Sequence, residues 1–488
     1  MATNPSTAAV TDTGYRLTRL NLACQPASSG TKSTIMIPST TDTALTTSTC
    51  SATSTTISTR AYDIIAHTNP TVKFDRLVAA DRYDKQSNPN GIINLGTAEN
   101  KLCADILSKK LAEFQHKPEE ETLNYYPQLK GAPSFRSAVA KFIELHFKAN
   151  HRIDPENLVV LCGTTPVLET LSFAVAEHGD YFMIPTPYYH RIYNDINDRA
   201  GINSLNVPLY GMEGDINKAY DLTRAAFEKT YEDAVTKGLK VKGIVLLSPH
   251  NPTGDIYTKD QLVDILNFAN KYKLHVIMDE IYALSVFDTY KDNFTSVLQL
   301  DVPDPDRVHV VWGFSKDFGL SGYRVGCVYS RNQQLIKYFE TTAIFAMPAA
   351  PILQRLEYLI SDTDWVEKDY LPVYQRRLRE SFDVVKQRLE KHGIRVYPSQ
   401  ASFFIWADVT KYMRERSFKA EEELLSRILQ AKVYVMTGQH NYSCEPGWLR
   451  IIFSVNREQL NIGLDRIESV LFKIEKEQAD KPEHISRL

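Results

Sequence analysis

The sequence predicts an α/β protein in which a large domain holds a mostly parallel sheet covered by helices, followed by a smaller α+β domain. Two observations predict this class. In the first part of the chain, short apolar runs rich in Val and Ile alternate with segments of helical periodicity, which is typical of a parallel sheet buried between helices. After about residue 350, a long helical stretch and a few separate strands follow instead, which is typical of an α+β unit.

Five apolar runs are expected to form the large sheet: 158–161, 181–184, 243–247, 275–278 and 308–312. Polar side chains follow the ends of these runs, namely Thr164, Tyr189, Asn251, Asp279 and the pair Ser315 and Lys316. Ligands of open parallel sheets bind outside the carboxyl ends of the strands. We therefore expect these side chains to gather at one edge of the sheet and to form a ligand site.

The smaller domain is expected from helical periodicity over 365–392 and 421–430 and from strands at 394–397, 403–406 and 448–453. These elements and the composition divide the chain into five expected parts. They are a disordered Ser/Thr-rich extension (1–60), an N-terminal arm packing with the small domain (61–105), a large ligand-binding domain (106–350), a small C-terminal domain (351–476) and a charged tail (477–488).

The N-terminal extension is expected to be disordered because residues 28–60 are dominated by Ser and Thr and hold few large apolar groups. Such a segment cannot bury enough surface to offset the entropy that it would lose on ordering. Its hydroxyl-rich, acid-poor composition is also that of organelle transit peptides. A cytoplasmic location is the expectation, and import into an organelle is the alternative.

Composition excludes several classes of protein. The 488 residues include 56 Lys and Arg and 59 Asp and Glu, so the formal net charge is −3. This balance leaves no excess of basic residues for nucleic acid. No apolar run approaches the roughly 20 residues that cross a bilayer. The six cysteines form no Cys/His cluster at metal-ligand spacing. We therefore expect a small-molecule partner, without nucleic acid, membrane or metal.

Three segments carry groups with defined chemistry. A lysine at a strand end, such as Lys316, can form an imine with an aldehyde, and Arg324 after it can hold a phosphate through two hydrogen bonds. The carboxylate of Asp279 can hold the proton of a pyridinium ring, and the phenol of Tyr282 can bond a ring oxygen. Two prolines and a glycine surround Asn251 and fix a turn that aims its amide.

Together and in this order, the three segments resemble the fold-type I pyridoxal-phosphate enzymes of the class I and II aminotransferase family, over about residues 65–470. The resemblance implies an aspartate-aminotransferase-like fold and pyridoxal 5'-phosphate as the cofactor. It implies that Lys316 is the catalytic residue that bonds to the cofactor. The positions that match cofactor ligands are Thr164, Thr165, Tyr189, Asn251, Asp279, Tyr282, Ser315, Lys316, Arg324 and Tyr126.

The resemblance also implies how the substrate is held. Arg450 matches the arginine that binds the substrate α-carboxylate. Tyr126 matches a tyrosine that reaches into the site of a neighbouring subunit, so a homodimer is expected. One departure from the family is Gly313, which stands where a hydroxyl side chain usually contacts the phosphate.

Within this family, residues 88–102, 315–320 and 444–448 resemble 1-aminocyclopropane-1-carboxylate (ACC) synthases. In that subfamily the acid that matches Glu99 helps to orient S-adenosylmethionine. Other positions differ from it. Leu129 stands where the subfamily has an active-site tyrosine, and Thr253 where it has leucine. The sequence Tyr-Tyr-His-Arg at 188–191 also replaces the usual Tyr-Tyr-Pro-Gly.

The resulting expectation is an aminotransferase of the ACC-synthase-like group that acts on an α-amino acid, with secondary metabolism as one setting. The alternatives are ACC-synthase-type γ-displacement on S-adenosylmethionine and carbon–sulfur lysis by β-elimination. A non-catalytic aminotransferase-like sensor or regulator is the remote alternative. Such regulators carry a DNA-binding helix-turn-helix in front of the aminotransferase-like domain, and residues 1–60 contain no such pattern and few basic side chains.

Overall fold

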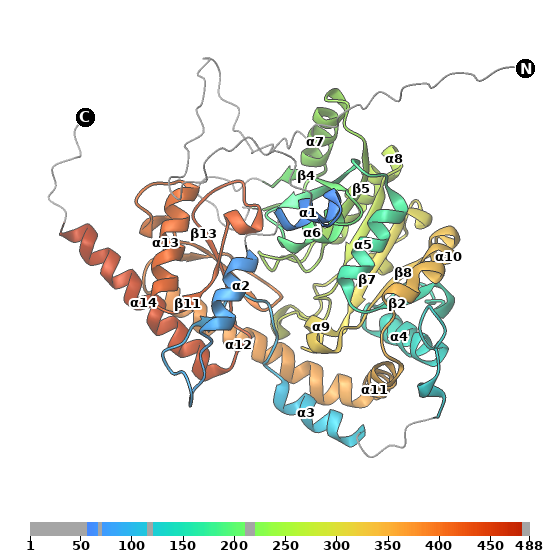
Figure 1. The fold of residues 1–488 in the computed structure, drawn as a ribbon, viewed down its shortest axis with the longest axis horizontal. Coiled ribbons are helices and arrows are strands. Elements are labelled where there is room, and N and C mark those ends of the chain that lie inside the picture. The colour runs from blue at the N-terminus through green and yellow to red at the C-terminus, as the bar shows by residue number, and fades with distance from the viewer. Residues whose placement is uncertain (1–55, 67–70, 115–120, 210–219, 481–488) are drawn as a thin grey trace, which may run out of the picture. The chain divides into compact units, whose positions relative to one another are not determined.

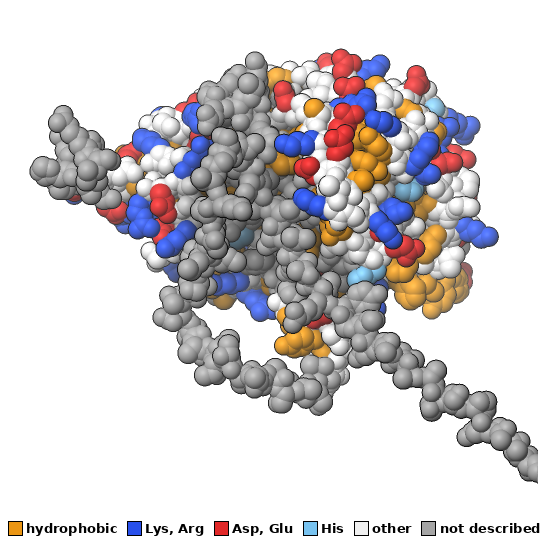
Figure 2. Space-filling model, turned by 90° about the horizontal axis from the view of Figure 1, so that it is seen from above, with side chains coloured by type: hydrophobic (Ala, Val, Ile, Leu, Met, Phe, Trp, Pro, Cys, Tyr) orange, Lys and Arg blue, Asp and Glu red, His pale blue; other side chains and the backbone are white. Residues whose placement is uncertain are grey.

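The computed structural model describes residues 56–66, 71–114, 121–209 and 220–480, all within one compact unit of the chain, 47–488. Most of the expected extension, residues 1–55, therefore lies outside the described residues, as does 481–488 of the expected tail. Among the helices of the described ranges, none combines the length and apolar character that a membrane span requires. On the face seen in Figure 2, basic and acidic side chains are interspersed.

The large sheet has seven strands in the order β2-β8-β7-β6-β5-β3-β4. Neighbouring strands run parallel except in the two pairs that include β8, so the expected mostly parallel sheet is confirmed. The strands are β2 (Leu158–Leu161), β3 (Tyr181–Thr186), β4 (Asn203–Pro208), β5 (Val241–Leu247), β6 (His275–Asp279), β7 (Val308–Gly313) and β8 (Gly326–Ser330).

Two of these strands, β4 and β8, were not among the expected ones. β4 lies at the edge of the sheet, where alternating polar residues are tolerated, so its sequence lacks a continuous apolar run. β8 begins with Gly326 only a few residues after the Lys316 segment, and its antiparallel course needs no intervening helix.

Helices follow most of the strands and cover the sheet. Figure 1 shows α5 lying across β7 and β8, which it contacts directly. The Thr258 side chain and the Gln261 side chain form a reciprocal capping box at the start of α8. The helices are α3 (Ala104–Glu113), α4 (Pro133–His146), α5 (Thr164–Val175), α6 (Arg191–Asn197), α7 (Arg224–Thr236), α8 (Lys259–Tyr272), α9 (Phe314–Asp317), α10 (Gln333–Thr342) and α11 (Ala350–Ser361).

The C-terminal part contains a four-stranded antiparallel sheet in the order β12-β13-β10-β9. The expected helices and strands of this α+β unit are all present, and a π-helical turn at Trp365–Tyr370 precedes α12. The elements are α12 (Leu371–Glu390), β9 (Arg395–Val396), β10 (Phe404–Asp408), α13 (Phe418–Gln430), β11 (Val433–Tyr434), β12 (Met436–Thr437), β13 (Trp448–Ile452) and α14 (Arg457–Ala479).

The N-terminal arm is tied to the C-terminal part through backbone pairing. β1 (Ile93–Asn94) pairs in parallel with β11, after helices α1 (Thr59–Ala66) and α2 (Thr71–Ala80). Two helices extend across expected boundaries. Helix α1 already includes Thr59 and Arg60, because a helix needs its first turn ahead of the apolar residues that follow. Helix α14 runs into the expected tail because its last residues, such as Glu477 and Gln478, favour helix.

A buried carboxylate fixes the loop that leads into β13. Glu421 of α13 is fully buried and accepts hydrogen bonds from the backbone N–H groups of Gln439 at 2.8 Å, Gly447 at 2.6 Å and Trp448 at 3.2 Å. Buried N–H groups that lose their acceptor destabilise a fold strongly. The position of β13, which carries Arg450, therefore depends on this carboxylate.

We expect Glu421→Ala to lower the free energy of unfolding by about 3 kcal/mol, because the two buried N–H groups of Gly447 and Trp448 and the partly buried N–H of Gln439 lose their acceptor. Urea denaturation followed by circular dichroism measures the change. Glu423→Ala on the same helix is the control, since its carboxylate is exposed and forms only a surface ion pair with Arg414. Equal stability of the two variants would contradict this role.

Candidate active site

The candidate site lies where β5, β6 and β7 end together. Register aligns Leu247 with Asp279 and Asp279 with Val311 on these neighbouring strands. The backbone continues the alignment past the strand ends, since Ser248 N–H donates to the Asp279 carbonyl at 3.0 Å. The segments that carry Asn251, Asp279 and Lys316 are therefore side by side at the carboxyl edge, as the strand-end pattern predicts.

Lys316 lies on the short helix α9, directly after β7, and is half-buried. Its Nζ donates to the Ala98 carbonyl at 2.7 Å, and the Asn100 amide donates to the Lys316 carbonyl at 3.0 Å. Burial, with a smaller effect from the Arg450 guanidinium, lowers the pKa of Lys316 to about 8, against the opposing effect of nearby carboxylates. A large fraction of this amine is therefore neutral near pH 8 and available as a nucleophile or base.

Asp279 ends β6 and is buried, and its Oδ1 accepts from the Ile281 N–H at 3.2 Å. Burial raises the pKa of Asp279 to about 7, and the nearby carboxylate of Asp195 adds to this effect. None of the ion pairs among the described residues includes Asp279. A buried carboxylate that forms no ion pair in these ranges fits a ligand that brings a protonated nitrogen to this point.

Arg450 of β13 reaches from the small sheet to the site and is 1% exposed. Its Nη1 donates to Asn251 Oδ1 at 3.0 Å, and its Nη2 donates to the Gly96 carbonyl at 2.8 Å. The Asn251 amide in turn donates to the Tyr282 hydroxyl at 3.3 Å. Nε of Arg450 is buried without a hydrogen-bond partner among the described residues. The guanidinium thus has neutral partners only and fits a ligand carboxylate.

Gly163, Arg324 and the start of α5 lie together. Gly163 precedes the helix with φ +108°, and a Cβ atom there would lie 2.6 Å from Nη2 of Arg324. This φ favours glycine, and the Arg324 guanidinium lies against Gly163, directly before the first backbone N–H groups of α5 at Thr164 and Thr165. A helix N-terminus beside an arginine fits a phosphate. Ser315, buried at the start of α9, is the fourth expected phosphate ligand.

Gly313 has a steric explanation. A Cβ atom at this position would lie 2.8 Å from the Val325 carbonyl oxygen and 2.9 Å from the Gly326 Cα. Since β7 and β8 approach so closely here, the chain has no room for the hydroxyl side chain that the family usually carries.

The remaining expected site residues, Tyr189, Glu99 and Tyr126, differ in how far they are buried. Tyr189 follows β3 and is half-buried, and burial raises the pKa of its phenol to about 12. Glu99 is exposed and pairs with Lys101 at 3.1 Å, and both line a small pocket of about 190 Å³. Tyr126 is 91% exposed, so its side chain does not complete the site of its own subunit.

Two buried groups near the site were not expected from the sequence. Asp195 of α6 accepts from Thr165 Oγ1 at 3.2 Å, so this threonine is already engaged, and burial raises the pKa of Asp195 to about 6. His190 is buried, and its Nε2 lies 3.2 Å from Thr71 Oγ1. The sequence contained one signal for Asp195, its spacing of four residues from Arg191. The two side chains approach to 3.9 Å, but this spacing is that of an ordinary helical ion pair and does not by itself indicate a functional site.

Comparison with known proteins gives the family context. The profile of the family described as Aminotransferase class I and II matches residues 90–467. The chain is 38% identical over 393 residues to 1-aminocyclopropane-1-carboxylate synthase-like protein 1 of Mus musculus, covering 80% of this chain and 78% of that protein. It is 36% identical over 394 residues to the probable inactive 1-aminocyclopropane-1-carboxylate synthase-like protein 2 of Homo sapiens, covering 80% and 69%.

Among solved structures, the aspartate aminotransferase of Thermotoga maritima matches with a TM-score of 0.66 at 24% identity, covering 85% of this chain and all of that one (100%). This similarity confirms the expected aspartate-aminotransferase-like fold.

The lowered pKa of Lys316 predicts a distinct reactivity of its amine. In protein freed of bound ligands, reductive methylation of Lys316 should follow an apparent pKa near 8, because only the neutral amine reacts. Removal of the nearby positive charge in Arg450→Met should raise this value. Peptide mass spectrometry over a range of pH measures both, with exposed lysines of the same digest as the reference. An apparent pKa near the free-lysine value of about 10.4 would contradict the prediction.

Proposed function

Because this chain belongs to the class I and II aminotransferases, whose cofactor is pyridoxal 5'-phosphate, we propose that it is an aminotransferase of the ACC-synthase-like group acting on an α-amino acid. The observation that carries the proposal is a pair of buried ionisable side chains that form no ion pair among the described residues. No ion pair in these ranges includes Asp279, and the Arg450 guanidinium has only neutral hydrogen-bond partners. The ring nitrogen of the cofactor and the carboxylate of an amino acid would supply the two missing partners.

The residues present fit the cofactor. Asp279 would hold the ring nitrogen in its protonated form, while Asn251 and Tyr282 would bond the ring hydroxyl and Tyr189 would stack on the ring. The phosphate would lie between the start of α5 and Arg324, with Thr164, Thr165 and Ser315 as further ligands. When bound, the cofactor supplies an electron sink for the bond that breaks at the substrate Cα.

The chain's own residues then perform three tasks. Arg450 binds the substrate carboxylate and so fixes the direction of the Cα–H bond. The neutral amine of Lys316 removes this proton and returns it, since a pKa of about 8 suits a general base near neutral pH. The carboxylate of Asp279 would keep a proton on the ring nitrogen of the bound cofactor. These tasks are common to transamination, β-elimination and γ-displacement, so the side-chain pocket decides the outcome.

Leu129 favours transamination over formation of ACC. It is half-buried and packs against the hydrophobic core, and it offers neither a hydroxyl nor an aromatic face to a sulfonium substrate. Thr253 carries less weight, because its hydroxyl donates to Asp255 at 2.7 Å and is turned into the fold. The resemblance to proteins named ACC synthase-like supports γ-displacement as the second candidate, with carbon–sulfur lysis beside it.

A non-catalytic role is a third candidate, because one similar protein is named as probably inactive. In this chain, however, Lys316, Asp279 and Arg450 are all present and lie at one edge of the sheet.

A homodimer with shared sites is also part of the proposal. Tyr125 and Tyr126 are 63% and 91% exposed, and Ile344 and Phe345 are 55% and 86% exposed, which is unusual for large apolar side chains. The second pair lies next to the start of α5, since the Cys162 N–H donates to the Ala346 carbonyl at 2.6 Å. An interface there would bury these side chains and bring a partner's tyrosine to the cofactor phosphate.

The reaction is tested by product analysis with a panel of amino acids, with and without a 2-oxo acid. We expect amino transfer that depends on the 2-oxo acid, and release of ACC and methylthioadenosine from S-adenosylmethionine at least tenfold slower, since an aligned contact is worth about 1–3 kcal/mol. Lys316→Arg should abolish turnover and serves as the blank. Rapid, stoichiometric release of ACC and methylthioadenosine would contradict the aminotransferase proposal.

If Tyr126 contacts the cofactor of the neighbouring subunit, we expect its removal to weaken cofactor binding while the fold and the dimer remain. Tyr126→Ala should weaken binding of pyridoxal 5'-phosphate by about tenfold while sedimentation still gives a dimer, because one charged hydrogen bond is removed. Phe345→Glu should instead produce monomers by burying a charge at the interface. Tyr290→Ala is the control, as an exposed tyrosine at a distance in sequence from both pairs. A fully active monomer would contradict this arrangement.

A further inference from the structure

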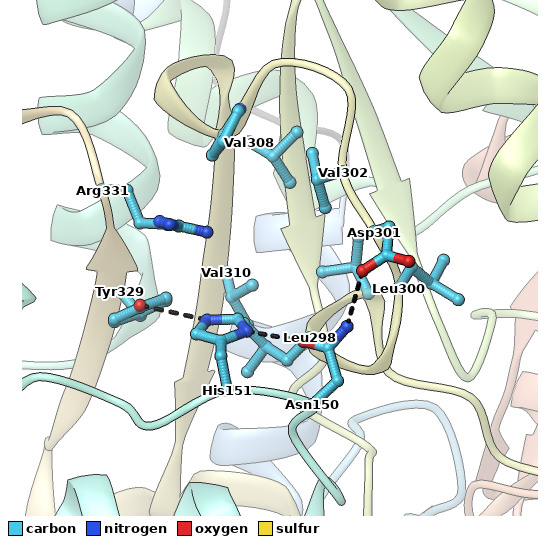
Figure 3. Close-up of a pocket in the computed structure, with 12 residues that line it drawn as sticks. Asn150, His151, Leu298, Leu300, Asp301, Val302, Val308, Val310, Tyr329 and Arg331 are labelled. Atoms are coloured by element: carbon cyan, nitrogen blue, oxygen red, sulfur yellow. Dashed lines mark hydrogen bonds between the residues drawn. The ribbon is translucent and has the colours of Figure 1, made fainter.

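A cavity of about 280 Å³ lies at the edge of the large sheet opposite to the candidate active site. Val308, the first residue of β7, lines it, whereas Lys316 follows the other end of the same strand. Its walls come from the segment after α4, the loop around 297–305, and the adjoining ends of β7 and β8 (Figure 3). It is therefore separate from the proposed cofactor and substrate site.

A continuous hydrogen-bonded chain forms one wall of the cavity. The Asn150 amide donates to Asp301 at 3.2 Å, which leaves its oxygen to accept from His151 Nδ1 at 2.7 Å. The other ring nitrogen, Nε2, then accepts from the Tyr329 hydroxyl at 3.3 Å. Burial and the nearby Arg331 lower the pKa of His151, which keeps the ring neutral in this arrangement. These hydrogen bonds fix the orientation of the polar side chains in this wall, and Asp301 already accepts one from Asn150.

Arg331 is an exposed arginine that lines the cavity. It directly follows β8, and Figure 3 shows its side chain extending over the cavity from the side opposite to Asp301. None of the ion pairs found within the described ranges includes Arg331. The floor between the two sides is apolar and consists of Leu298, Leu300, Val302, Pro305, Val308 and Val310.

We propose that this cavity binds a small monocarboxylate with an apolar body, whose carboxylate pairs with Arg331 and whose body rests on the apolar floor. A single guanidinium matches one carboxylate through two parallel hydrogen bonds. The volume is at the lower limit of ligand pockets, so it suits a molecule of about ten heavy atoms. The carboxylate of Asp301 on the far side disfavours a ligand with a second negative charge.

The test uses 4-fluorophenylacetate as the probe and 4-fluorophenylacetamide as its neutral counterpart, observed by fluorine NMR with the cofactor-loaded enzyme. We expect the acid to bind at least tenfold more tightly than the amide, because a charged hydrogen bond is lost in the amide. Arg331→Gln should weaken binding of the acid by about tenfold. Arg376→Gln, which removes an exposed arginine of α12, should leave binding unchanged.

Two further variants locate the bound probe. Val302→Phe fills the cavity without removing a charge and should also weaken binding. Arg450→Lys alters the proposed substrate site and should leave binding of the probe intact. Equal binding of acid and amide, retention of binding in Arg331→Gln, or loss of binding in Arg450→Lys would each overturn the proposal.

Discussion

The hydrogen bond between the Arg450 guanidinium and the Asn251 amide, at 3.0 Å, joins the two sheets at the site. A buried guanidinium with neutral partners is costly, and the cost is tolerated only where the surrounding fold holds the group in place. The backbone of Arg450 is held by pairing with Trp406 and Met436 in the small sheet. Its guanidinium is held by the hydrogen bond to the Gly96 carbonyl of the N-terminal arm. The same contacts hold the Arg450 guanidinium among neutral partners, where we propose that the substrate carboxylate binds.

Opposing charges around Lys316 set its reactivity. Arg450 and Arg324 favour the neutral amine, while Glu99 and Asp279 favour the ammonium form, and burial decides the balance toward neutrality. Asp279 is affected in the reverse sense, because burial and Asp195 favour its protonated form while Lys316 favours the carboxylate. A protonated ring nitrogen beside Asp279 and a carboxylate beside Arg450 would offset the two buried charges, which links the fold to the proposed chemistry.

Much of this arrangement follows from local sequence. The buried strands ahead of Asn251, Asp279 and Lys316 have continuous apolar runs, and parallel strands bring their carboxyl ends to one edge. Other features depend on contacts between distant segments. The bond from Arg450 to Asn251 joins residues 199 positions apart. Likewise, β8 approaches Gly313 so closely that it excludes a side chain there, and nothing in the sequence around Gly313 indicates this contact. Strand β4 was not predicted because an edge strand tolerates polar residues and so lacks a continuous apolar run.

We propose that Lys316, and no other lysine, bonds to the cofactor. Borohydride reduction of the cofactor-loaded protein, followed by digestion and mass spectrometry, identifies the lysine, because reduction makes the bond between the cofactor and an amine permanent. The geometry predicts one labelled peptide, the one that contains Lys316, and a label that stays on this lysine in an Arg450→Lys variant. A label on another lysine, or none on a protein that retains the cofactor, would contradict the proposed site.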